Sequence, residues 1–144
     1  MKHSLVFIIS NCFCMIMVAD GESFRQQVQT TQKKCQANPD TAIDESDFRL
    51  FLNKLGPKPN NLGAHAKCFF KNMGLLNSDG NINKADLRKL LELIERDQNV
   101  INVIIGKCTS TEEDDEATAA HLLSCMIKHA PDDQKRTSVP EQTS

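Results

Sequence analysis

The chain contains neither tryptophan nor tyrosine, and phenylalanine supplies all of its aromatic residues. It therefore has no indole or phenol group with which to anchor a polar ligand. It also has no large excess of charge, because 17 basic and 19 acidic residues give a formal net charge of −2. A nucleic-acid-binding protein is expected to carry a clustered basic face, so this composition argues against a nucleic-acid partner.

Sequence motifs for catalysis are absent as well. Serine, histidine and aspartate are present, but the chain has no G-x-S-x-G nucleophile elbow, no phosphate-binding glycine loop and no Cys–His nucleophile pattern. We therefore predict no enzymatic activity, no catalytic residue and no cofactor.

No apolar run in the sequence is long enough for a membrane-spanning helix. The run over residues 5–19 follows Lys2 and His3 and precedes small or polar residues. About 15 apolar residues fall short of the roughly 20 that span a bilayer, whereas this layout is typical of a secretory signal peptide. Cleavage after Ala19 or after Gly21 fits the sequence, and we place it after Gly21. The protein is thus predicted to be secreted.

Secretion changes the number of cysteines in the mature chain. Two of the six, Cys12 and Cys14, lie in the signal peptide, so four remain. An even number in a small exported protein predicts two disulfides. Three pairings are open, and spacing alone does not select one for the four remaining residues, which are Cys35, Cys68, Cys108 and Cys125.

Beyond the signal peptide, apolar residues recur at helical spacing and predict six helices and no strand. The first helix is expected over residues 22–37, with Phe24 and Val28 on its apolar stripe. The second begins near Asp44 and stops at Gly56–Pro57.

The third and fourth helices follow from their caps. Asn60 or Asn61 can cap the third, which runs to Gly74. Asn83 caps the fourth, and Asp86 stands three residues later, as in a capping box. The apolar stripe of the fourth helix obeys the i, i+3, i+4, i+7 rule and consists of Leu87, Leu90, Leu91 and Ile94.

The last two helices complete the predicted domain. The fifth covers residues 98–107; its β-branched residues favour a strand, but no other segment offers a strand partner. The sixth is expected to start at Ser110 or Thr111, with acidic residues 112–116 in its first turn, where they suit the positive end of the helix dipole. Pro131 stops it.

The predicted architecture is therefore a single all-α domain of six helices stapled by two disulfides. Its boundaries are a signal peptide over residues 1–21, a helical domain over 22–131 and a polar tail over 132–144.

Polar residues after the third helix resemble a calcium-binding loop. With Gly80 at position 6 of such a loop, Asn77 and Asp79 fall at positions 3 and 5. Position 1, however, is Leu75, which has no side-chain oxygen, and position 12 is Asp86, which is shorter than the usual glutamate. We therefore predict a turn between two helices, with Gly80 supplying a positive φ.

Histidine and cysteine also occur at a spacing that zinc would accept. His121, Cys125 and His129 recur at i, i+4 and i+8 on one helical face, and His65 precedes Cys68 by three. A zinc site would need Cys125 as a thiolate, whereas an exported chain is expected to oxidise it. We predict no metal ligand.

Apolar residues exceed what one core-facing stripe per helix requires. Phe69 and Phe70 are adjacent, as are Leu75 and Leu76, and residues 103–105 are all apolar. A helix that is apolar on more than one face must be buried on both. Two interpretations remain open: a well-filled core, which is the commoner use of apolar residues, or an internal apolar cavity.

The cysteine spacing resembles that of the insect odorant-binding (pheromone-binding) family. Between successive cysteines of the mature chain lie 32, 39 and 16 residues. The family has six cysteines, the second and third separated by three residues and the fifth and sixth by eight. That pattern places the missing second and fifth cysteines at Ala64 and Glu116, which in the family are bonded to each other. Losing both resembles the four-cysteine "minus-C" branch, and the stretch HAKCFFKNMGLLNSDGNIN is similar to the family's sequence after its third cysteine.

This resemblance implies disulfides Cys35–Cys68 and Cys108–Cys125 and a secreted, non-enzymatic carrier. Its partner would be a small hydrophobic ligand, with a membrane chemoreceptor as a second partner that the sequence leaves open, and the carrier would be a monomer or weak homodimer. The residues expected to line the cavity are Phe48, Leu52, Leu55, Phe69, Phe70, Met73, Leu76, Leu87, Leu91, Ile94, Ile104, Leu122, Leu123 and Met126.

Two alternatives remain open at this point. The same fold could carry extracellular lipids or amines outside olfaction, or the chain could be a disulfide-stapled interaction protein with a filled core and no cavity.

Overall fold

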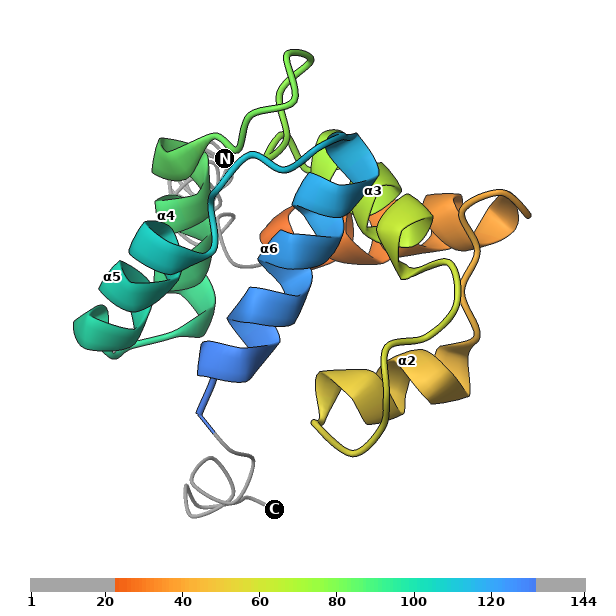
Figure 1. Cartoon of the computed structure of the whole chain (residues 1–144), viewed down its shortest axis with the longest axis horizontal. Helices are drawn as coiled ribbons and strands as arrows, with labels where there is room; N and C mark the ends of the chain where they lie inside the picture. The colour runs from red at the N-terminus through yellow and green to blue at the C-terminus, as the bar shows by residue number, and fades with distance from the viewer. Residues whose placement is uncertain (1–22, 132–144) are drawn as a thin grey trace, which may run out of the picture.

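The computed structural model of the protein describes residues 23–131. The predicted signal peptide and the predicted tail lie outside these residues. The described chain is helical, as predicted, and contains no helix that is both long and apolar enough to cross a membrane. After an N-terminal helix over residues 23–37, the elements in chain order are α2 (Glu45–Leu52), α3 (Leu62–Asn72), α4 (Lys84–Ile94), α5 (Gln98–Lys107) and α6 (Asp115–His129) (Figure 1).

Helix α6 occupies the middle of the fold. In Figure 1 it runs between the α4–α5 pair on one side and α2 and α3 on the other. It packs against both α3 and α5, and α5 packs in turn against α4. The main core forms where these helices meet, and its most deeply buried leucine and isoleucine side chains are Leu87, Leu91, Ile101 and Leu122.

A second, smaller core cluster lies at α2. It consists of Ile43, Phe51 and Leu62, with Phe48 and Leu123 packed against it. Helix α2 is therefore attached to the rest of the domain by few buried side chains.

The two disulfides confirm the pairing that the family resemblance implies. Cys35–Cys68 joins the N-terminal helix to α3, and Cys108–Cys125 joins the end of α5 to α6. Their Cα atoms are 6.0 and 5.4 Å apart, within the usual range for a disulfide. Each loop closure should stabilise the fold by about 3 kcal/mol through its effect on the unfolded chain.

Aspartate and asparagine caps begin most of the helices where the sequence predicts them. The Asp44 side chain accepts a hydrogen bond from the Asp47 amide at the start of α2. At α4, the Asn83 side chain accepts from the Asp86 amide, which confirms the predicted cap, and donates to the Asp86 carboxylate. The Asn83 amide donates to the Leu75 carbonyl oxygen instead, so the second hydrogen bond of a capping box is not formed. Asn61 precedes α3 as predicted, but its side chain donates instead to the carbonyl oxygens of residues 40 and 42.

Helix α2 ends earlier than Gly56–Pro57, where the sequence predicts its end. Its last helical residue is Leu52, and Lys54 adopts a φ of 61°, which turns the chain out of the helix. The Leu55 amide then donates to the carbonyl oxygen of Leu50, closing the terminus with a helix-ending hydrogen bond.

The predicted start of the sixth helix is wrong by about one turn. Helix α6 begins at Asp115, because the Asp114 side chain accepts a hydrogen bond from the Ala117 amide. The hydroxyl of Thr111, an expected cap, instead donates to the Asn81 side chain. Only Asp115 and Glu116 of the acidic run stand in the first turn.

The predicted turn between α3 and α4 is confirmed. Gly80 has a φ of 86°, and an antiparallel bridge between Leu76 and Ile82 closes the turn. The Asp79 carboxylate accepts a hydrogen bond from the Asn81 amide. The polar side chains of this segment thus hold its backbone in place.

Candidate functional site

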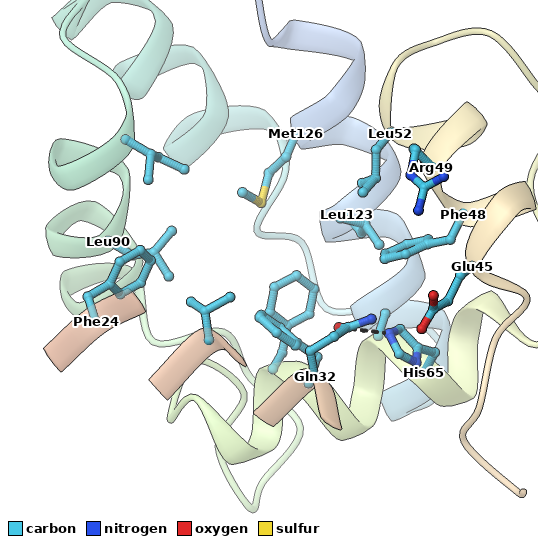
Figure 2. Close-up of a pocket in the computed structure, with 15 residues that line it drawn as sticks. Phe24, Gln32, Glu45, Phe48, Arg49, Leu52, His65, Leu90, Leu123 and Met126 are labelled. Carbon is cyan, nitrogen blue, oxygen red and sulfur yellow. Dashed lines mark hydrogen bonds between the residues drawn. The ribbon is translucent and has the colours of Figure 1, made fainter. Parts of the chain in front are cut away.

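A cavity of about 580 Å³ lies between the N-terminal helix, α2, α3, α4 and α6 (Figure 2). Helix α5 contributes nothing to it, and the small cluster at α2 adjoins it through Phe48 and Leu123. The fifteen lining residues are Phe24, Val28, Gln32, Glu45, Phe48, Arg49, Leu52, His65, Ala66, Phe69, Phe70, Leu90, Ile94, Leu123 and Met126.

Helical periodicity explains why these residues share one hollow. On the N-terminal helix, Phe24, Val28 and Gln32 recur every four residues, so their side chains project from the same face. The other helices contribute residues at the same three- and four-residue spacing, such as Leu90 and Ile94 of α4. Each helix offers the cavity one edge of its apolar stripe.

The structure brings seven of the fourteen expected lining residues to the cavity. Helices α2 and α3 each supply two of them, α4 supplies one and α6 supplies two. These residues are Phe48, Leu52, Phe69, Phe70, Ile94, Leu123 and Met126.

Five other expected residues lie in the filled core instead. They are at most 4% exposed, and none of them lines the cavity; they are Leu76, Leu87, Leu91, Ile104 and Leu122. Successive helical residues point about 100° apart. Leu91 and Leu122 therefore face the core, while their neighbours Leu90 and Leu123 reach the cavity.

The remaining two expected residues lie elsewhere. Met73 packs at the edge of the main core, where its sulfur accepts a weak hydrogen bond from the Thr31 hydroxyl at 3.7 Å. Leu55 lies in the turn after α2 and is 73% exposed. Its position is set by the early end of α2, which carries it away from the helix face that lines the cavity.

Sequence reasoning missed eight lining residues, and they fall into three groups. Phe24, Val28 and Leu90 belong to apolar stripes that the periodicity already identifies, so a signal for them was present. Ala66 is small and carries no such signal. The four others are polar or charged, and an apolar pattern does not select them; they are Gln32, Glu45, Arg49 and His65.

His65 is the most constrained of these polar residues. Its ring is almost completely buried, with Nδ1 2.8 Å from the Thr41 carbonyl oxygen and Nε2 3.2 Å from Gln32 Oε1. The Phe48 ring packs edge-to-face on it, with centroids 5.2 Å apart. Burial lowers the pKa of His65 below its ordinary value, and the hydrogen bond to Thr41 offsets this only in part.

Outside the cavity, Cys108, Cys125 and His129 bring their ligand-type atoms within 4.8 Å of one another. Both sulfur atoms belong to a disulfide, so this group has no thiolate to offer a metal ion. His121 shares the zinc-like spacing in the sequence, and its Nε2 lies 3.4 Å from the Lys107 carbonyl oxygen.

The first turn of α6 lies against the start of α3. A Cβ atom on Gly63 would stand 3.2 Å from Cβ of Glu116, and Lys71 Nζ forms an ion pair with Asp115 at 2.7 Å. Hydrogen bonding and attraction from Lys71 hold the pKa of Asp115 below its usual value. The helices that carry Ala64 and Glu116, where the family resemblance places a missing bridge, are thus in direct contact.

Comparison with known proteins identifies the family of the chain through one match. No curated protein matches the chain. The model of the PBP/GOBP family matches residues 18–129, which is well over half of the chain and includes all of the described helices. Members of this family bind small hydrophobic ligands. The chain therefore belongs to the PBP/GOBP family, which is the insect odorant-binding protein family.

Proposed function

We propose that this protein is a secreted carrier that binds small hydrophobic molecules of the odorant or pheromone type in the cavity between its helices. The observation that carries the proposal is a hollow of about 580 Å³, lined largely by apolar side chains, in a chain of this family. Cavities of roughly 300–1,000 Å³ are typical of small-molecule sites. The two disulfides fit an extracellular location.

Burial of apolar surface is the proposed driving force. A ligand that loses about 300 Å² of apolar surface to the cavity gains roughly 7.5 kcal/mol, at 25 cal/mol per Å². Part of this gain is offset by the loss of translational and rotational freedom on association. We therefore expect dissociation constants weaker than about 1 μM for ligands without a polar anchor, since 1 μM corresponds to roughly 8 kcal/mol.

The seven expected residues that reach the cavity, together with Phe24, Val28 and Leu90, are the proposed apolar contacts. The cavity also argues against the alternative of an interaction protein with a completely filled core. An extracellular lipid or amine carrier outside olfaction would use the same contacts, so the tissue of expression distinguishes it.

Two adjacent residues of α4 offer a matched test. Ile94 lines the cavity, Leu93 does not, and they are 54% and 50% exposed. Because of this exposure, aspartate at either position should leave the helical circular-dichroism spectrum unchanged. Ile94→Asp should weaken binding of a hydrophobic fluorescent probe at least about tenfold, because it places a charge against the apolar ligand. Leu93→Asp should bind the probe as the natural protein does.

The outcome that would overturn the proposed function is equally specific. If the natural protein binds no displaceable apolar probe, or if the two aspartate variants bind it equally well, the cavity is not the ligand site.

A further inference from the structure

We infer that the cavity selects amphiphilic ligands whose head group donates a hydrogen bond, a hydroxyl or a protonated amine, and that Gln32, oriented by His65, and Glu45 receive that head group. This inference rests on the proposed function and adds a ligand class and two specificity-determining residues to it.

The lining of the cavity is divided between two sides. Figure 2 shows Gln32 hydrogen-bonded to His65, with the Glu45 carboxylate on the same side of the cavity. Phe24 and Leu90 lie across the cavity from them. A ligand that fills the cavity therefore meets polar groups at one end and hydrocarbon at the other.

The hydrogen bonds of His65 fix where its proton is. Its Nδ1 faces the carbonyl oxygen of Thr41, which can only accept, so Nδ1 must carry a proton. A neutral imidazole then has no proton on Nε2, which can only accept. Burial favours this neutral form, as the lowered pKa of His65 indicates.

The neutral His65 ring, with its proton on Nδ1, in turn orients the Gln32 side chain. The Gln32 atom beside Nε2 is Oε1, at 3.2 Å, and two acceptors at that distance do not satisfy each other. A half-turn of the carboxamide resolves the conflict, because the NH₂ group then donates to Nε2. Gln32 Oε1 is thereby directed away from His65, and since Gln32 lines the cavity, it offers the ligand an acceptor.

The charged residues of the lining favour the same kind of ligand. Glu45 and Arg49 are the only described lining residues that carry a full charge at neutral pH, and both belong to α2. In Figure 2 the Phe48 ring lies between Arg49 and the Gln32–His65 pair, whereas Glu45 is on the side of that pair. Gln32 and Glu45 are both acceptors, so the head group that satisfies them is a donor.

A series of ligands with one apolar chain tests this inference in the natural protein. Decan-1-ol, decylamine, decyl methyl ether and decanoate would each displace a hydrophobic fluorescent probe at neutral pH. The alcohol should bind roughly fivefold to tenfold more tightly than the ether, which cannot donate, and the amine should also exceed the ether. Decanoate should bind most weakly, because two acceptors face its carboxylate.

Variants then assign the preference to residues. Gln32→Leu should bring the affinities for the alcohol and the ether within about twofold of each other, because no acceptor remains at that position. Glu45→Gln should weaken binding of the amine, because the negative charge is lost. It should change the alcohol-to-ether ratio much less than Gln32→Leu does, because glutamine keeps an acceptor oxygen. Asp47→Asn removes an exposed carboxylate of the same helix outside the cavity lining; it is the control and should preserve both preferences.

Each outcome decides between distinct conclusions. Equal affinities for the alcohol and the ether in the natural protein overturn this inference and leave the carrier function intact. Tightest binding of decanoate also overturns it, because the head group would then meet Arg49. Failure of all four ligands and the probe to bind rejects the carrier function itself. Since the first comparison uses the natural protein, poor folding of a variant does not affect it.

Discussion

The two halves of this domain use apolar helices in different ways. Where α4, α5 and α6 meet, Leu87, Leu91, Ile101 and Leu122 are at most 1% exposed and fill the space between the helices. On the side of the N-terminal helix, α2 and α3, similar residues surround a hollow of about 580 Å³. The difference shows that an apolar surplus serves both as core and as cavity wall within one small domain.

Helices α4 and α6 take part in both halves, and single residue steps separate the two roles. Leu91 faces the core and Leu90 the cavity, just as Leu122 faces the core and Leu123 the cavity. Because successive helical residues point about 100° apart, one helix can support a solid interior and a binding surface at once.

The disulfides provide the largest predicted effects and distinguish the two halves. Removing Cys35–Cys68 or Cys108–Cys125 by paired alanine substitutions should each lower the free energy of unfolding by about 3–4 kcal/mol, measured by denaturant titration. Loss of Cys35–Cys68 should also weaken probe binding, because it releases the N-terminal helix from α3 and both helices line the cavity.

Loss of Cys108–Cys125, which joins α5 to α6, should leave probe binding nearly unchanged under conditions in which the variant is folded. An equal loss of probe affinity in both disulfide variants would contradict the division, because it would mean that the core half supports ligand binding as much as the cavity half does.

Adjacent leucines of α6 give the next largest effect. Leu122→Ala should lower the free energy of unfolding by about 3 kcal/mol, because it opens a void in a filled core. Leu123→Ala should cost clearly less in the ligand-free protein, because Leu123 already faces the cavity. Leu123→Ala should weaken probe binding more than Leu122→Ala does, since Leu123 is a proposed ligand contact. Equal costs in urea titrations would contradict the division between the halves.

Stability should also respond to pH through His65 on the cavity side. Burial places the pKa of folded His65 below the ordinary 6.5, so between these two values the unfolded chain binds more protons than the folded one. The free energy of unfolding should therefore decrease as the pH falls below about 6.5, until the pKa of the folded state is passed. Urea titrations at successive pH values measure this slope.

The matched controls for the pH prediction are histidine variants. His65→Gln should flatten the slope, although it lowers stability at neutral pH. His121→Gln should retain the slope, because His65 is intact in that variant. If the slope persists in His65→Gln and disappears in His121→Gln, the pH response comes from His121, and the prediction for His65 is contradicted.

Much of this structure could be predicted from the sequence. Apolar periodicity and caps such as Asn83 located the helices, and the family's cysteine spacing gave the correct disulfides. The start of α6 was missed because Ser110, Thr111 and Asp114 are all competent caps. Only tertiary contacts, such as that of Thr111 with Asn81, decide between them.

The cavity was only partly predictable for a similar reason. Periodicity identifies the apolar face of a helix, but it does not say whether that face meets a neighbour or an empty space, as Leu90 and Leu91 illustrate. Polar lining residues such as Gln32 and His65 depend on the packing of distant helices. A pattern within one helix therefore does not identify them.

Native mass spectrometry with a matched pair of variants tests the central claim most directly. After incubation with an apolar ligand of about ten carbons, the natural protein and Leu93→Asp should retain one bound molecule, whereas Ile94→Asp should lose it. The same adduct on all three proteins, or on none of them, would contradict a carrier built around this cavity.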